Sequence, residues 1–206
     1  MPITLTNVTN QLNYPGAAYP STSHVLISRN TFYFRSNRLI RTLGDRIPKI
    51  APTAWVSEAA YVVGDVQIGE YASIWPGVTI RGDGDKSIVI GKFVNIQEGS
   101  VIHGNGMLIE DNVSIGHSVV VHCNRVGAGS LLGNNSTILN GVIIGEQCLI
   151  AANSVVLADQ SVPDRSFVTG IPGIIKRPVT ETQISRMANT AKHLASKAQE
   201  FKDSGI

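Results

Sequence analysis

Aliphatic residues recur at every sixth position through the middle of the chain. This period matches neither the 3.6-residue period of an amphipathic helix nor the two-residue alternation of a half-buried strand. It is the period of hexapeptide repeats, in which each repeat forms one short strand and one corner of a triangular prism. Three repeats close one coil, so residues about eighteen apart stack as inward-facing ladders. The longest run is Val126, Leu132, Ile138, Ile144, Ile150 and Val156, and shorter runs are Val62 to Ile80, Ile90 to Ile102 and Ile109 to Val121.

The pattern predicts an all-β fold, a parallel β-helix domain over residues 45–175. Glycine often follows the aliphatic anchor, and asparagine is frequent; both suit corners, where left-handed backbone angles cost them little. The asparagines expected at corners are Asn95, Asn105, Asn112, Asn124 and Asn135.

Residues 176–206 are expected to form a C-terminal α-helix and tail. Thr180 and Gln183 make a T-x-x-Q capping box, which begins a helix. An apolar stripe at helical spacing follows, and we expect it to pack against the prism or a neighbouring subunit. The stripe contains Ile184, Met187, Ala188, Ala191, Leu194, Ala195, Ala198 and Phe201.

Residues 1–44 are assigned to an N-terminal extension. The segment has no Asp or Glu but four arginines, and it is rich in Ser, Thr and Asn. Such composition is typical of organelle transit peptides. The alternative is an extension that packs along a neighbouring subunit.

The overall composition excludes several classes of protein. A net charge of +2 with 16% charged residues gives no basic surface for nucleic acid. Two cysteines do not make a disulfide framework. Because no run of about 18 apolar residues exists, we expect no transmembrane helix.

The six-residue step breaks at three places, and loops that leave a regular solenoid often carry function. The step is ten between Ile80 and Ile90, where the insert includes "RGDGDKS". The step is seven between Ile102 and Ile109, where the insert includes "HGNG". The step is five between Val121 and Val126, and this short step contains His122.

Three of the five histidines, His103, His117 and His122, lie at or near these breaks. Three imidazoles with one open position make a common catalytic zinc site. His103 precedes His122 by nineteen residues, close to one coil, so the two should stack on one edge. His117 then lies on a different edge, and all three can meet only if prisms pack side by side around a threefold axis. The alternative is that the three histidines serve no common site.

Two further features flank the histidines. Arg81 and Asp83 form an opposed pair in "RGD", which could fix subunit register at an interface or be an ordinary exposed pair. Gln97 lies six residues before His103 and could orient a metal-bound water, or be an ordinary polar corner residue.

The segments "GDVQIGEYASIWPGVTIRGD", "NIQEGSVIH", "IEDNVSIGHSVVVH" and "GIPGIIKR" together resemble the γ-class carbonic anhydrase family. The resemblance implies a single-stranded left-handed parallel β-helix that is trimeric, with Zn²⁺, Fe²⁺ or Co²⁺ at each subunit interface. It implies metal ligands His103 and His122 from one subunit and His117 from its neighbour. Arg81 and Asp83 match the interface ion pair, and Gln97 matches the residue that hydrogen-bonds the metal-bound solvent.

The activity implied by the resemblance is the reversible hydration of CO2 to bicarbonate by a metal-bound hydroxide. A proton must then reach bulk solvent. The acidic shuttle loop of the well-studied family members is absent here, because "GNGMLI" follows His103 without a carboxylate. Glu98 is the nearby carboxylate considered for this shuttle.

Two other functions stay open. The chain also resembles the γ-carbonic-anhydrase-like subunits of mitochondrial respiratory complex I, which attach to its membrane arm on the matrix side. That implies a weakly active or inactive structural subunit in a homotrimer, or in a heterotrimer with paralogous subunits. A cytoplasmic location in a bacterium is the alternative to the mitochondrial one. The third function is a hexapeptide-repeat acyltransferase, which needs a catalytic histidine in a coenzyme A groove but neither three clustered histidines nor Gln97.

Overall fold

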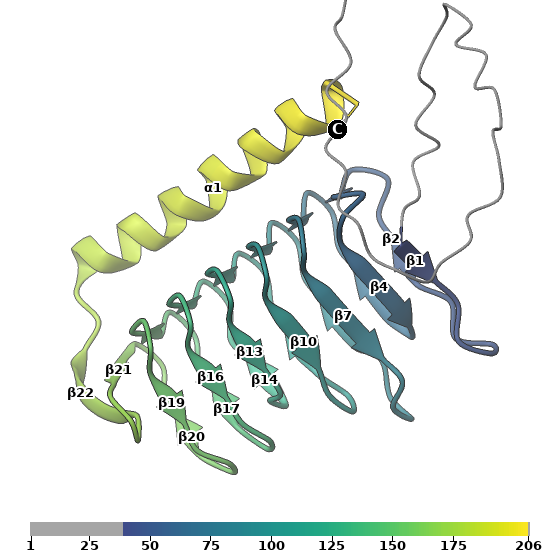
Figure 1. Cartoon of the computed structure of the whole chain (residues 1–206). Helices are drawn as coiled ribbons and strands as arrows, with labels where there is room; N and C mark the ends of the chain where they lie inside the picture. The colour runs from purple at the N-terminus through teal and green to yellow at the C-terminus, as the bar shows by residue number, and fades with distance from the viewer. Residues whose placement is uncertain (1–38, 206) are drawn as a thin grey trace, which may run out of the picture. The chain divides into compact units, whose positions relative to one another are not determined.

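The computed structural model describes residues 39–205, which form a left-handed parallel β-helix followed by one α-helix (Figure 1). Its coils build three sheets. Sheet 1 contains β1 (Leu39–Arg41), β4 (Tyr61–Gly64), β7 (Thr79–Gly82), β10 (Val101–His103), β13 (Val120–Val121), β16 (Thr137–Ile138) and β19 (Val155–Val156). Sheet 2 contains β2 (Lys49–Ile50), β5 (Val66–Ile68), β8 (Ile88–Ile90), β11 (Leu108–Ile109), β14 (Arg125–Val126), β17 (Ile143–Ile144) and β20 (Ser161–Val162). Sheet 3 contains β3 (Trp55–Val56), β6 (Ser73–Ile74), β9 (Asn95–Ile96), β12 (Ser114–Ile115), β15 (Leu131–Leu132), β18 (Leu149–Ile150), β21 (Ser166–Thr169) and β22 (Ile174–Pro178).

The strand register confirms the coil length predicted from the hexapeptide step. In a regular coil Thr137 pairs with Val155, eighteen residues further on. The three breaks change this spacing, since Thr79 pairs with Val101, Val101 with Val120, and Val120 with Thr137. Loops therefore absorb the extra and missing residues, and the strands stay in register.

The predicted aliphatic anchors form the core. In sheet 1, for example, Ile80, Ile102, Val121, Ile138 and Val156 occupy one ladder and are fully buried. Burying one such side chain contributes about 1.5–3 kcal/mol relative to leaving it exposed, so the ladders are the main favourable term for this fold.

The corners confirm part of the prediction and correct one assignment, that of Asn95. Asn112 and Asn135 have positive φ values of 60° and 58°, as expected for left-handed corner positions. Asn95 is not at a corner; it is buried within β9. The glycines that follow the aliphatic anchors are also required by the close stacking of the coils. A Cβ at Gly127 would lie 2.4 Å from backbone atoms of Gly145 on the next coil, so close coil stacking requires glycine there.

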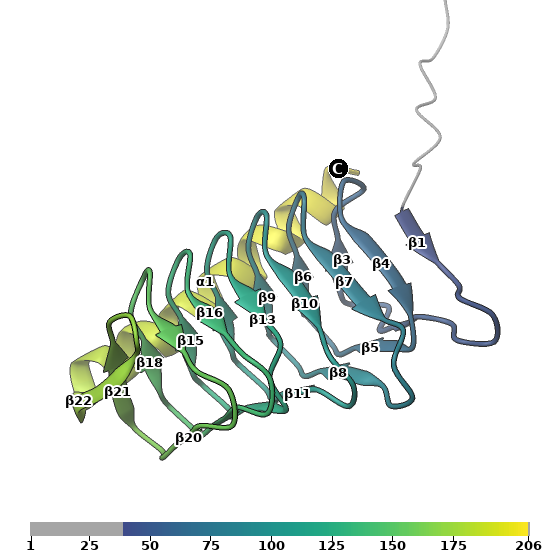
Figure 2. The ribbon, with the colours of Figure 1, turned by 60° about the horizontal axis from the view of Figure 1, so that its bottom comes forward.

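Helix α1 (Glu181–Asp203) begins with the predicted capping box, in which Thr180 and Gln183 exchange hydrogen bonds. Met187, Ala191 and Ala198 of its apolar stripe are buried. The helix packs against β3, β6, β9 and β12, so it runs back along the outside of sheet 3 toward the first coil (Figure 2). Near its end Phe201 packs with Trp55 and Trp75, whose ring centroids lie 5.0 Å apart.

Strand pairing starts at Leu39 and the last strand ends at Pro178, so paired strands reach past both ends of the range 45–175. Most of the predicted N-terminal extension, residues 1–38, lies outside the described residues. In the part of the chain that the structure describes, the helix is not apolar enough to span a membrane.

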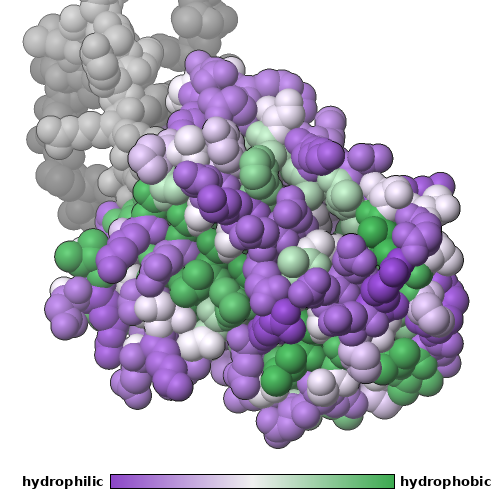
Figure 3. Space-filling model, turned by 180° about the vertical axis from the view of Figure 1, so that it is seen from behind, coloured by the Kyte–Doolittle hydropathy of each residue, from purple (hydrophilic) through white to green (hydrophobic). Residues whose placement is uncertain are grey.

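The outward face of sheet 2 carries exposed apolar side chains, among them Leu108 and Ile143. Figure 3 shows the molecule from behind, where several hydrophobic patches are separated by hydrophilic residues. Because successive residues of a strand point to opposite faces, Leu108 is exposed while Ile109, its neighbour on β11, is fully buried.

Candidate functional site

Three predicted site residues meet where adjacent strands of sheet 1 end. Arg81 is on β7, and His103, its register partner, is the last residue of β10. His122 directly follows β13. Val121, the last residue of β13, is the register partner of Ile102, so His122 comes one position after Val121 just as His103 comes one position after Ile102. The altered steps between these coils thus bring the side chains to one level.

The two histidine rings face each other. Nε2 of His122 lies 2.8 Å from Nδ1 of His103, and the ring centroids are 4.7 Å apart. This geometry confirms the prediction that His103 and His122 stack on one edge of the prism.

Asp83 and Arg81 hold the His103 ring. Nε2 of His103 lies 2.9 Å from Oδ1 of Asp83, and Nη2 of Arg81 lies 3.1 Å from Nδ1 of His103. A guanidinium only donates hydrogen bonds, so Nδ1 of His103 is an acceptor and its Nε2–H donates to Asp83. Arg81 also donates to Oδ2 of Asp83 at 2.6 Å, as the predicted opposed pair.

The Asp83 carboxylate is stabilised in its charged form. Partial desolvation raises its pKa, but the hydrogen bond from His103 and the positive charge of Arg81 outweigh that effect and lower the pKa below its ordinary value. Asp83 therefore stays an ionised acceptor for the His103 ring near neutral pH.

His117 lies at the other end of the same strand. It is in the turn between β12 and β13, and its Nδ1 lies 2.9 Å from Oε2 of Glu98. Extended chain rises about 3.3 Å per residue, so the five steps from His117 to His122 span up to about 16 Å. Across residues 39–205, no three His, Cys, Asp or Glu side chains are gathered closely enough to hold a metal.

The donor set fits a transition metal in part. A tetrahedral zinc ion with Zn–N distances of about 2.0–2.1 Å separates two ligand nitrogens by about 3.3 Å. The facing nitrogens of His103 and His122 are 2.8 Å apart, so a small ring rotation would open the required gap. Imidazole nitrogens suit zinc and iron alike.

Gln97 follows β9 on sheet 3, and its Nε2 donates to Oδ1 of Asn95 at 3.3 Å. Asn95 in turn donates to Oγ of Ser114 at 2.7 Å and is buried. Sequence reasoning missed Asn95 as a neighbour of Gln97. The signal was the spacing N-x-Q, because residues two apart on a strand point to the same side.

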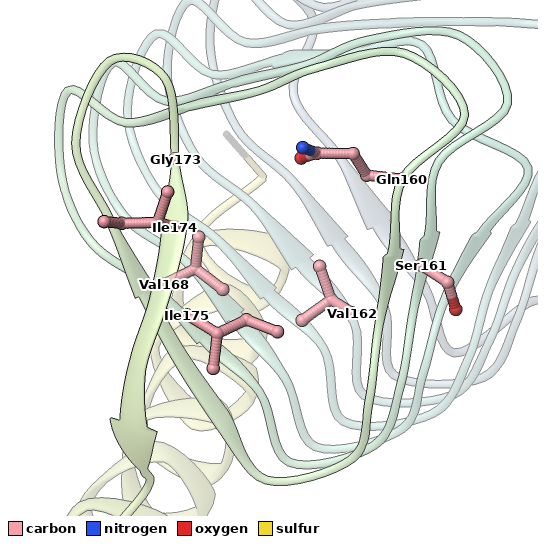
Figure 4. Close-up of a pocket in the computed structure, with 7 residues that line it drawn as sticks. All are labelled: Gln160, Ser161, Val162, Val168, Gly173, Ile174 and Ile175. Atoms are coloured by element: carbon pink, nitrogen blue, oxygen red, sulfur yellow. The ribbon is translucent and has the colours of Figure 1, made fainter.

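A pocket of about 260 Å³ lies elsewhere, at the open C-terminal end of the coils (Figure 4). Its lining comes from β20, β21, β22 and their flanking residues: Gln160, Ser161, Val162, Val168, Gly173, Ile174 and Ile175. Its lining contains no titratable side chain.

Comparison with known proteins agrees with the hexapeptide repeat. The bacterial transferase hexapeptide family model (six repeats) matches residues 125–158. A probable carbonic anhydrase of Methanocaldococcus jannaschii is 43% identical, over 69% of this chain and 91% of its own length. Gamma carbonic anhydrase 2, mitochondrial, of Arabidopsis thaliana is 33% identical over 79% of this chain.

The match covers only 62% of the length of that Arabidopsis protein. Among solved structures, a hexapeptide transferase family protein from Anaplasma phagocytophilum is 28% identical and superposes with a TM-score of 0.77, covering 80% of this chain and 99% of its own. The coil architecture, the ordered histidines and these similarities show that the chain belongs to the γ-class carbonic anhydrase family.

Proposed function

We propose that the protein is a γ-type carbonic anhydrase that reversibly hydrates CO2 to bicarbonate at the interfaces of a trimer. The observation that carries this proposal is the facing pair of ring nitrogens on His103 and His122, 2.8 Å apart, with His117 held at the opposite end of the strand. Each chain thus offers two ligands at one edge and one ligand at another. Side-by-side packing around a threefold axis would complete three sites.

The ligands proposed for the metal are His103 and His122 of one subunit and His117 of the next. Zinc, or iron or cobalt in its place, would lower the pKa of a water molecule to about 7 and so supply a nucleophile for CO2 at neutral pH. Asp83 accepts the Nε2–H of His103, which leaves the lone pair on Nδ1; a metal there would replace Arg81 as the partner of that lone pair.

Gln97 is proposed to orient the attacking water, because its amide carries both donors and an acceptor. The hydrogen bond to Asn95 fixes one Gln97 donor, and with it the direction of the Gln97 side chain. Arg81 neutralises Asp83 beside the histidines, and in a trimer it would also lie at the subunit interface.

Mixed trimers test whether the site is shared. His117→Ala and His122→Ala proteins are each expected to lose the metal. When the two variants are denatured together and refolded as a 1:1 mixture, a site is complete only where a His117→Ala subunit supplies His103 and His122 and its His122→Ala neighbour supplies His117. Random assembly completes about a quarter of the sites, so about a quarter of the wild-type metal content should return. If mixing restores nothing, each site lies within one chain and the proposed shared site is wrong.

Stopped-flow CO2 hydration on the same metal-loaded samples tests the enzyme. Activity should follow metal content across the wild type, the two variants and their mixture. Full metal content without hydration would instead support the second function, an inactive or weakly active subunit attached to the membrane arm of respiratory complex I.

That second function is favoured by one specific observation, the similarity to an Arabidopsis protein named as mitochondrial. It would place the chain on the matrix side, in a homotrimer or with paralogous subunits. The similarity to the M. jannaschii protein equally supports an enzyme outside mitochondria. Co-purification with a large respiratory complex distinguishes the two locations. Binding of coenzyme A would instead indicate an acyltransferase; the similar Anaplasma protein is described as a hexapeptide transferase family protein.

A further inference from the structure

The His117 corner is held from three directions. Its backbone N–H donates to Oδ1 of Asn134 at 3.0 Å, and its backbone C=O accepts from the N–H of Asn135 at 2.9 Å. Its ring contacts Glu98, with 2.9 Å between Nδ1 and Oε2. Both the backbone and the ring of His117 therefore have a defined orientation, although half of its side chain is exposed.

The ring contact has little value for stability alone. The Glu98 side chain is 45% exposed, and ion pairs between exposed side chains contribute about 0–1 kcal/mol to folding. The contact does, however, determine which nitrogen carries the proton. A carboxylate only accepts, so Nδ1 of a neutral His117 must carry the hydrogen, and the lone pair is then on Nε2.

Glu98 and Asp83 act alike on their histidines. Asp83 takes the Nε2–H of His103, and Glu98 takes the Nδ1–H of His117. Histidines that bind metals usually donate their other ring N–H to a carboxylate or carbonyl, which fixes the tautomer and makes the free nitrogen a better ligand.

We propose that Glu98 is a positioning residue, which presents Nε2 of His117 to the metal site of a neighbouring subunit. The inference rests on the proposed function and replaces the role of proton shuttle for this carboxylate. Oε2 of Glu98 is already engaged with Nδ1 of His117, the ring nitrogen that would not bind the metal. Glu98 therefore acts on ligand geometry and not on proton release.

The first test is cobalt affinity, measured by titrating metal-free, full-length protein and following the visible spectrum of bound Co²⁺. Glu98→Ala should raise the dissociation constant by about 10–100-fold. Glu98→Gln, whose amide oxygen still accepts from Nδ1–H, should recover most of the affinity. Glu70→Gln is the matched control, because Glu70 is a comparably exposed carboxylate paired with Lys92 at 2.8 Å and should leave affinity unchanged.

The second test needs no metal. In ¹⁵N-histidine-labelled, metal-free protein at pH 8, the His117 ring should show the Nδ1–H tautomer, and Glu98→Ala should shift it toward Nε2–H. A wild-type ring in the Nε2–H form would overturn the inference, and so would a Glu98→Ala affinity equal to that of Glu70→Gln. If His117→Ala keeps full cobalt affinity, the shared metal site itself is wrong, whatever Glu98 does.

Discussion

Two neighbouring residues on β11 test directly which side chains point into the core of the β-helix and which point out to solvent. Ile109 is fully buried and stacks between Ile90 and Val126 of the adjoining coils. Leu108, one position earlier, points out of sheet 2 and is 39% exposed. Both Ile109→Ala and Leu108→Ala remove three carbon atoms, so the pair separates burial from side-chain size.

The expected magnitudes differ severalfold. Removing three buried carbons at about 0.8 kcal/mol each costs Ile109→Ala about 2.4 kcal/mol, and the cavity left between the two neighbouring coils brings the total to about 3–4 kcal/mol. Leu108→Ala should cost about 1 kcal/mol or less, because the outward side chain is only partly covered.

Urea unfolding followed by circular dichroism measures both values. All proteins should be compared at one subunit concentration, because assembly stabilises the folded chain by mass action. Equal losses for the two variants, or a loss below about 1 kcal/mol for Ile109→Ala, would refute the assignment of Ile109 to the core ladder.

Three other outcomes are expected. The hydrogen bonds from Arg125 lower the pKa of Glu110 below its ordinary 4.5, so Glu110→Gln should cost about 1 kcal/mol at pH 7, and the difference in unfolding free energy should vanish as the pH falls through that lowered pKa. Asn134→Ala removes the acceptor for the His117 N–H and should weaken cobalt binding, whereas Asp164→Ala removes an equivalent cap, 2.8 Å from the N–H of Glu146, and should lower only the melting temperature. Gly127→Ala should lower the unfolding free energy by about 2–3 kcal/mol, because its Cβ would meet the backbone of the next coil.

The fold was predictable because the information is local and repeated. An aliphatic residue every sixth position needs only one coil geometry, and each further repeat tests the same geometry. The stacking of His103 on His122 follows from the same arithmetic, since nineteen residues are one coil with one insertion. The helix was likewise predictable from its capping box and apolar stripe.

What the sequence did not reveal lies between coils. Asp83 was paired in sequence with Arg81, yet the structure also places it against His103, twenty residues further on. Asn95 was assigned to a corner, but its side chain is buried and bonds Ser114 and Gln97. These contacts depend on side-chain direction at the end of a strand, which periodicity does not specify.

His117 and His122 lie on either side of the short strand β13. β13, with only two residues, crosses one face of the prism, so residues just before and just after it point from opposite edges of sheet 1. The rings of His117 and His122 cannot bind the same ion from opposite ends of this strand, because metal–nitrogen bonds are only about 2 Å long. Under the proposed function, the same strand therefore supplies ligands to two different metals, and loss of either histidine would damage a different interface. That is why mixing two inactive variants is expected to restore sites, a result that no intrachain arrangement of these residues can produce.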